Sequence, residues 1–246
     1  MGKVTGVIFD VDGTLAETEE IHRRAFNETF ENFKVQWFWD QHTYKRLLKV
    51  TGGKERIKFY AKEMRSDLED TDIADLHRYK TTLYEQLVTS GGISLRPGVE
   101  RLIRELQASS IKILIATTTN YSNVVTLVDS TLGPGSTNVF DVIAAGDVVR
   151  HKKPSPDVYI KALEEASLDP KECLAIEDSR NGLLAALSAG VATIITPSSY
   201  TKDENFSEAI SVVEHLGMPE LPCKGLHGTY PKDGVVTVPW IADIIK

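Results

Sequence analysis

Val7-Ile8-Phe9-Asp10-Val11-Asp12-Gly13-Thr14 joins an apolar run, which begins at Val4, to two carboxylates and a glycine. The apolar residues predict a buried strand, and Gly13 predicts a turn directly after it. Because two acids at the end of a buried strand repel each other and resist desolvation, they favour a shared hard cation. Asp and Gly are also common in turns that have only a structural role. This stretch alone leaves a metal site and a structural turn equally open.

The composition limits the classes of protein to which the chain can belong. With 246 residues it is long enough for one α/β domain or for a core with an inserted subdomain. Its 28 basic and 35 acidic residues give a net charge of −7, so we expect no nucleic-acid partner. No apolar run approaches the roughly 20 residues of a membrane-spanning helix, and the N-terminus lacks the layout of a secretory signal. We therefore expect no membrane partner.

The two cysteines, Cys173 and Cys223, lie far apart in the sequence and belong to no CxxC or Cys/His motif. We interpret them as thiols rather than as metal ligands or a disulfide. This usage is typical of a reducing compartment and predicts a cytoplasmic protein.

The region that follows the first strand has the spacing of helices. Apolar residues recur at helical intervals in four segments, namely 21–30, 44–50, 55–64 and 73–88. We predict a helical subdomain, residues 17–92, inserted into an α/β core formed by residues 1–16 and 93–246. Trp37 and Trp39 are interpreted as packing anchors of this subdomain, and a place in the wall of a substrate cleft is left open.

From residue 99 onward, helical and strand patterns alternate. Helices are expected at 99–106, 122–132, 155–166 and 182–189, and strands at 111–116, 140–144, 173–176 and 192–195. This alternation predicts right-handed βαβ crossovers and a parallel sheet. We expect a short strand at 211–213 and irregular structure over 216–233. Thr237 is predicted to cap a final helix that continues to residue 245.

Polar residues follow four of the expected strands. In chain order they are Asp10 and Asp12, the run 117–120, the run 150–154, and Glu177-Asp178-Ser179. Ligands of a doubly wound sheet bind outside the carboxyl ends of its strands, so we expect these groups to converge on one edge. Arg150 and Lys152 are interpreted as solvated neighbours of Lys153.

These polar groups resemble the four motifs of the haloacid dehalogenase superfamily in order and spacing. The motifs are Phe9–Thr14, Ala116-Thr117, Lys153-Pro154 and Glu177-Asp178-Ser179. The helical insertion is similar to the cap of the β-phosphoglucomutase-like subfamily. Three further stretches look like the CbbY sugar-phosphate phosphatases of carbon fixation, namely Leu15–Glu19, Arg24–Phe30 and Gly52–Arg56.

The resemblance implies a Rossmann-like core, a helical cap and a hydrolase. Its expected reaction is the Mg²⁺-dependent conversion of xylulose 1,5-bisphosphate to xylulose 5-phosphate. Asp10 would attack phosphorus and form an aspartyl-phosphate, while Asp12 would protonate the leaving alkoxide and later deprotonate the attacking water. Thr117 and Lys153 complete the expected catalytic set, because each can bind an oxygen of the transferring phosphate.

The resemblance also implies the metal ligands. Mg²⁺ would be held by the side chain of Asp10, the backbone carbonyl of Asp12 and the carboxylate of Asp178. Glu177 would bind the ion through a water molecule or contact the other ligands rather than the ion itself. The alternative for the Glu177-Asp178 pair is the N-cap of a helix, and both roles can coexist.

Substrate contacts are expected from the core and from the inserted helices. The expected contacts to the transferring phosphate are Thr118, Thr119 and Asn120. A second phosphate would meet the glycine turn and the cations at the start of a helix, where backbone amides are also available. The candidates there are Gly52, Gly53, Lys54 and Arg56, with Lys80 on a later helix. Glu17 and His22 are placed to bond sugar hydroxyls, although His22 is equally well explained as an ordinary residue of a helix surface.

Two other functions are compatible with the same motifs. A phosphosugar mutase would use the same aspartyl-phosphate but return the phosphoryl group to the sugar, and a catalytically silent binding module would keep only the fold. We expect a monomer that acts on a small sugar bisphosphate. The plastid stroma is the alternative location if a transit peptide has been removed.

Overall fold

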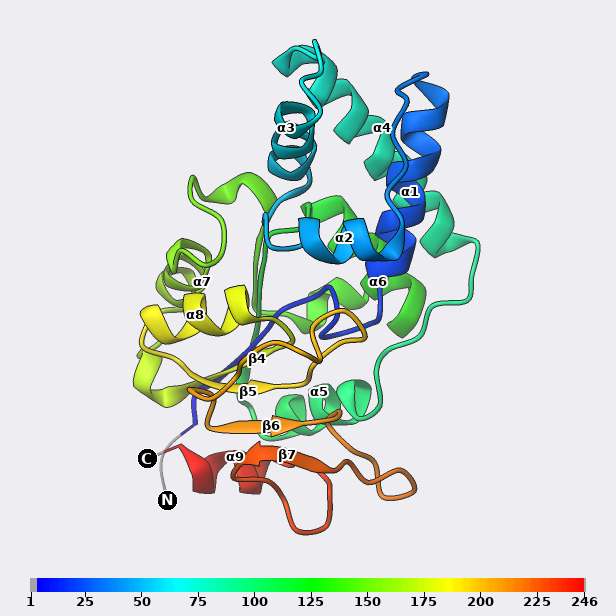
Figure 1. Ribbon diagram of the computed structural model, residues 1–246. Coiled ribbons are helices and arrows are strands. Elements are labelled where there is room, and N and C mark those ends of the chain that lie inside the picture. The colour runs from blue at the N-terminus through cyan, green and yellow to red at the C-terminus, as the bar shows by residue number, and fades with distance from the viewer. Residues whose placement is uncertain (1–3, 246) are drawn as a thin grey trace.

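The computed structural model describes residues 4–245 and contains a sheet with helices on both faces (Figure 1). Within these residues the strand order is β3-β2-β1-β4-β5-β6-β7, and all neighbours are parallel except β6 and β7. The strands are β1 (Gly6–Phe9), β2 (Lys112–Thr117), β3 (Val142–Ala145), β4 (Cys173–Glu177), β5 (Ala192–Ile195), β6 (Ser211–Val213) and β7 (Gly225–Gly228). The largely parallel sheet confirms the predicted α/β class.

β1 lies in the middle of the sheet and is buried on both faces. Val7 and Phe9 belong to one core cluster, whereas Ile8 belongs to the other. The first cluster includes residues of α5 (Val99–Ala108), α6 (Tyr121–Leu132) and α9 (Val238–Ile244), and the second those of α7 (Asp157–Ala166) and α8 (Arg180–Ser188). A strand covered on both sides needs apolar residues at successive positions, which explains the unbroken apolar run of β1.

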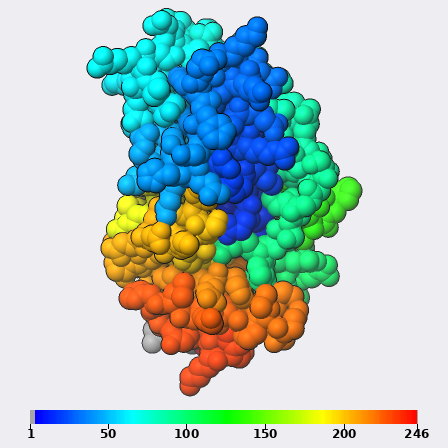
Figure 2. All heavy atoms as spheres, turned by 45° about the vertical axis from the view of Figure 1, so that its right-hand side comes forward, coloured from blue at the N-terminus to red at the C-terminus, as the bar shows by residue number. Residues whose placement is uncertain are grey.

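Residues 17–92 form four helices that make up one end of the molecule (Figures 1 and 2). They are α1 (Glu19–Asn32), α2 (Gln41–Leu47), α3 (Gly53–Glu63) and α4 (Asp70–Thr89). A cluster rich in aromatic side chains holds them together, and Tyr200 from the loop after β5 belongs to it. In it the fully buried Trp39 lies 4.7 Å from the ring of Phe26 and 4.8 Å from that of Phe30, measured between centroids. Trp39 is therefore a packing anchor, as predicted.

The C-terminal segment differs from its prediction. Residues 216–233 were expected to be irregular but contain β7, which pairs antiparallel with β6 at the edge of the sheet. β7 has glycine at both ends and is largely exposed, so it lacks the apolar alternation by which strands are recognised. The final helix α9 is confirmed, because the hydroxyl of Thr237 accepts a hydrogen bond from the amide of Trp240 at 3.3 Å.

Short 3₁₀ helices occupy three loops of the described chain, at η1 (Ser136–Val139), η2 (Gly146–Val148) and η3 (Pro170–Glu172). Cys173 and Cys223 are buried free thiols, as expected. Among residues 4–245, no helix combines the length and the apolar character that crossing a membrane requires.

Candidate active site

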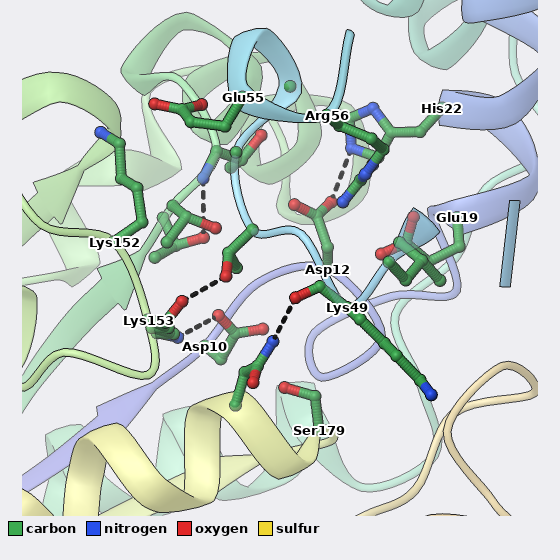
Figure 3. Close-up of a pocket in the computed structure, with 18 of the residues that line it drawn as sticks. Asp10, Asp12, Glu19, His22, Lys49, Glu55, Arg56, Lys152, Lys153 and Ser179 are labelled. Carbon is green, nitrogen blue, oxygen red and sulfur yellow. Dashed lines mark hydrogen bonds and ion pairs between the residues drawn. The ribbon is translucent and has the colours of Figure 1, made fainter. Parts of the chain in front are cut away.

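A cavity of about 630 Å³ lies where the carboxyl ends of the strands meet the four N-terminal helices (Figure 3). Asp10 follows β1, Thr117 ends β2 and Asp178 follows β4, and all three line the cavity together with Lys153. The parallel register of β1 with β2 and β4 brings these strand ends to one edge. The predicted convergence of the four polar groups is confirmed for these residues.

Lys153 joins two of the acids at the buried end of the cavity. Its Nζ lies 2.6 Å from Oδ1 of Asp10 and 2.5 Å from Oε1 of Glu177. Burial alone would lower the pKa of this ammonium group, but Asp10 and Glu177 raise the pKa above its ordinary value. Lys153 is thus held as a cation beside Asp10, where it can also bind an oxygen of a phosphate.

Three carboxylates meet at this end of the cavity. Asp10, Glu177 and Asp178 each place one oxygen within 4.8 Å of the others. Burial and Glu177 raise the pKa of Asp10 to about 8, with Lys153 opposing the shift, and burial, Asp10 and Glu177 raise the pKa of Asp178 well above its usual range. One ammonium group does not balance three such acids, so a hard divalent cation fits the cluster.

Asp12 points away from this cluster toward α1. Its Oδ1 accepts hydrogen bonds from the hydroxyl of Thr18 at 2.5 Å and from Nε2 of His22 at 2.9 Å. Burial opposes ionisation, but His22 and Thr18 lower the pKa of Asp12 to about 2. Asp12 is therefore a carboxylate in this arrangement, the form that can accept a proton.

Lys80 and His22 extend this chain of hydrogen bonds. Nζ of Lys80 lies 2.6 Å from Nδ1 of His22, and burial lowers the pKa of Lys80 to about 7. Burial and Lys80 also lower the pKa of His22, so its neutral ring accepts from Lys80 and donates to Asp12. The ring stacks on Tyr84 with centroids 4.0 Å apart. His22 and Lys80 thus lie beside Asp12, both on the wall of the cavity.

The last residue of β2 and the three residues after it form another wall. Thr117, Thr118, Thr119 and Asn120 all line the cavity. The hydroxyl oxygen of Thr117 accepts a hydrogen bond from the amide of Thr119 at 3.2 Å, which leaves its own proton available to an acceptor in the cavity. The side-chain amide of Asn120 donates to the hydroxyl of Thr81 on α4 at 3.3 Å. This wall therefore offers hydroxyl donors to a ligand in the cavity.

The other end of the cavity, away from the buried acids, is its mouth. It is formed by the start of α3 and by η2. Nζ of Lys54 lies 2.7 Å from Asp147, and Nζ of Lys152 lies 2.8 Å from the other oxygen of the same carboxylate. Gly52 has a φ of +93°, and a Cβ on Gly53 would come 2.5 Å from Nε2 of His77. The glycines thus allow the chain to approach closely at this turn.

Several residues lie in surroundings that the sequence did not predict. Lys152 was interpreted as solvated, but its side chain is only 10% exposed and its ammonium group also contacts the carbonyl of Gly146 at 2.5 Å. Arg56 lines the cavity, yet its guanidinium donates to the carbonyls of Leu47 and Val50 and to the hydroxyl of Tyr44, so it also supports the turn before α3.

Glu17 lies outside the set of residues that line the cavity. Its carboxylate accepts a hydrogen bond from the hydroxyl of Ser199 at 3.0 Å and lies 3.5 Å from Nε of Arg96. These contacts tie the start of the helical region to the loop after β5.

Sequence reasoning missed other residues that line the cavity. Asp147 follows β3, so the rule that ligands gather at strand ends would have found it. The remaining residues depend on how the helices and later loops lie over the sheet, and no local pattern marks them. They include Glu19, Lys45, Lys49, His77 and Asp203.

Comparison with known proteins identifies a family for most of the chain. The model of the haloacid dehalogenase-like hydrolases matches residues 4–190. Protein CbbY of Rhodobacter capsulatus is 46% identical over 226 residues, which cover 89% of this chain and 100% of the relative. Protein CbbY of Cereibacter sphaeroides is 49% identical over 206 residues, which cover 84% of this chain and 90% of the relative.

Solved structures of CbbY proteins also match this chain. CbbY from Rhodobacter sphaeroides in complex with phosphate is 48% identical and matches with a TM-score of 0.84, covering 86% of this chain and 94% of that one. A mutant of the same protein in complex with xylulose 1,5-bisphosphate is 47% identical, with a TM-score of 0.84 and coverage of 87% and 96%. A β-phosphoglucomutase from Clostridium difficile, 23% identical with a TM-score of 0.73, shares the fold and covers 85% of this chain and 90% of its own.

Proposed function

Since this chain belongs to the haloacid dehalogenase-like hydrolases and is a phosphatase of the CbbY group, we propose that it converts xylulose 1,5-bisphosphate to xylulose 5-phosphate. The observation that carries this proposal is the match to a CbbY mutant in complex with that bisphosphate, at 47% identity and a TM-score of 0.84. The distribution of charge in the cavity supports it, with acids and Lys153 at the buried end and Lys54 and Lys152 at the mouth. A substrate with a phosphate at each end suits this arrangement.

Magnesium is the proposed cofactor. The carboxylates of Asp10 and Asp178 and the backbone carbonyl of Asp12 would hold it, with Glu177 behind them. When bound, Mg²⁺ offsets the negative charge that builds up on the transferring phosphate. The clustered oxygens of Asp10, Glu177 and Asp178 support this choice, because a hard cation prefers oxygen ligands.

Asp10 is the proposed nucleophile. Its carboxylate forms a bond to phosphorus while the bond from phosphorus to the sugar oxygen breaks, which leaves an aspartyl-phosphate and an alkoxide. Thr117 and Lys153 bind oxygens of the phosphoryl group during the transfer. Asp12, which is ionised in the arrangement described above, first takes up a proton from solution and gives it to the alkoxide. In the second step it takes a proton from the water that attacks the aspartyl-phosphate.

The far phosphate is assigned to the mouth of the cavity. Lys54 and Lys152 already bind one anionic group there, the carboxylate of Asp147. The same ammonium groups can bind phosphate oxygens, and the backbone amides at the start of α3 add further donors. The loss of the far phosphate from a substrate should therefore weaken its binding more than it slows the chemistry.

We also propose that residues 17–92 act as a cap on a core formed by residues 1–16 and 93–246. Ion pairs join the two parts across the cavity, between Lys54 and Asp147 and between Lys45 and Asp203, both on exposed side chains. Exposed pairs are weak and exchange readily, so they permit opening. A cap of this kind would exclude water while the phosphoryl group moves.

A panel of sugar phosphates tests the substrate. We expect the value of kcat/KM for xylulose 1,5-bisphosphate to exceed that for pentulose and hexose monophosphates, with one free phosphate released per molecule of substrate. A mutase would instead give an isomerised bisphosphate or monophosphate with little free phosphate. Failure to release phosphate from any substrate, including an aryl phosphate, in the presence of Mg²⁺ would support the silent binding module.

A further inference from the structure

We propose that Tyr159, which lines no part of the cavity, is a positioning residue for this phosphatase and acts on Lys153 through Glu177. Tyr159 lies on α7 and is fully buried. Its hydroxyl donates a hydrogen bond to Oε1 of Glu177 at 2.7 Å, and its ring centroid lies 5.2 Å from Nζ of Lys153. One tyrosine thus lies beside both Glu177 and Lys153, the two residues next to the proposed nucleophile.

Glu177 has no contact with solvent, so its hydrogen bonds come from the protein. Oε1 accepts from both Tyr159 and Lys153, while Oε2 accepts from the backbone amide of Asp178 at 3.3 Å. A Cβ on Gly182 would lie 1.9 Å from Oε2, so the start of α8 packs directly against the carboxylate. The orientation of Glu177 is therefore fixed by Tyr159 on one side and by α8 on the other.

This arrangement decides how Lys153 is shared between two acids. Its ammonium group lies 2.6 Å from Asp10 and 2.5 Å from Glu177, at nearly equal distances. Because Tyr159 donates to the same oxygen of Glu177, it offsets part of the charge that attracts Lys153. Without the hydroxyl, Glu177 would be left short of a donor in a buried site and would attract the ammonium group more strongly. Lys153 would then move away from Asp10 and from the incoming phosphate.

The variant Tyr159→Phe tests this inference because it removes the hydroxyl and keeps the ring beside Lys153. The inference rests on the proposed phosphatase mechanism but not on the sugar, so the substrate is p-nitrophenyl phosphate in saturating Mg²⁺. We expect kcat to fall about three- to tenfold, since small displacements of catalytic groups are costly, while KM and the Mg²⁺ concentration for half-maximal activity stay within about twofold.

Val158→Ala provides a matched control for stability. Val158 precedes Tyr159 on α7, is fully buried in the same core cluster and has no polar contact with the site. We expect it to lower the melting temperature while kcat stays within about twofold of the wild type, because it leaves a small cavity only. A loss of stability by itself would therefore not explain a fall in kcat of Tyr159→Phe.

The double variant Tyr159→Phe/Glu177→Gln tests the path of the effect. If Tyr159 acts through Glu177, its substitution should change kcat less than about twofold when Glu177 is already Gln. The inference is overturned if Tyr159→Phe alone keeps kcat within about twofold, if its effect is additive with that of Glu177→Gln, or if it mainly raises the Mg²⁺ requirement. An inactive wild-type protein would instead contradict the proposed function.

Discussion

The two ends of the cavity hold similar ion pairs in opposite surroundings. Lys153 and Asp10 are 2.6 Å apart with side chains 3% and 10% exposed, whereas Lys54 and Asp147 are 2.7 Å apart with side chains 45% and 61% exposed. Water and salt screen the second pair but not the first. Nearly equal distances therefore describe contacts of different strength. The buried end fixes the reacting groups, and the mouth keeps its charges free for exchange with a ligand.

The largest expected effect is the loss of the nucleophile at the buried end. Asp10→Asn should lower kcat for xylulose 1,5-bisphosphate and for p-nitrophenyl phosphate by at least about 10³-fold, because the amide cannot form the aspartyl-phosphate. Steady-state kinetics measure this effect, and circular dichroism checks the fold. The same substitution at the mouth, Asp147→Asn, should leave kcat for the aryl phosphate within about threefold. Similar losses of kcat in both variants would contradict the proposed difference between the buried end and the mouth.

The second prediction concerns stability at the two ends. In the presence of EDTA, Lys153→Met should lower the free energy of unfolding by about 3 kcal/mol, because it leaves Asp10 and Glu177 buried without their cation. Lys54→Met should lower it by less than about 0.5 kcal/mol, since its partner remains hydrated. Urea unfolding measures both values. A loss at Lys54 as large as that at Lys153 would show that exposure does not decide the strength of these pairs.

The third prediction concerns the metal. EDTA should abolish turnover, and Mg²⁺ at about 100 times its Kd should stabilise the fold by about 2.7 kcal/mol. A thermal scan should show this as a rise of several degrees in Tm, since 1 kcal/mol corresponds to about 2–4 °C in a chain of this size. Asp178→Asn should remove most of the rise and Asp147→Asn should keep it. An equal rise in both variants would place the ion elsewhere.

The smallest expected effect is at the mouth. Lys54→Ala should raise KM for the bisphosphate about three- to tenfold and leave KM for p-nitrophenyl phosphate unchanged, because only the bisphosphate reaches this lysine. Lys58→Ala is the control, since Lys58 lies on the same helix but pairs with Asp70 and does not line the cavity. Equal changes in KM for both substrates would remove Lys54 from the binding of the far phosphate.

The buried end was predictable from the sequence, and the reason is geometric. Asp10, Thr117 and Asp178 follow strands that pair in parallel, so the strand pattern alone places them at one edge. The resemblance to the haloacid dehalogenase superfamily supplied Lys153 and the order of the steps. The four N-terminal helices were also predictable, because each buries one stripe of apolar residues.

The mouth was less predictable because it depends on how the helices lie over the sheet. The pairing of Lys54 with Asp147 at the mouth and the bonds of Glu17 to Ser199 outside the cavity join residues far apart in the sequence. No local pattern reports such contacts. β7 was missed for another reason, since an exposed edge strand with terminal glycines lacks the apolar alternation that identifies a strand.

Gly13 limits which substitutions this site can accept. Its φ is +81°, and a Cβ there would lie 2.3 Å from Oδ2 of Asp178. A single methyl group at this position would push apart the loop after β1 and the loop after β4, which come from the first and the last third of the chain. Libraries that diversify the substrate range should therefore hold residue 13 constant and vary exposed side chains of the entrance, such as Lys54.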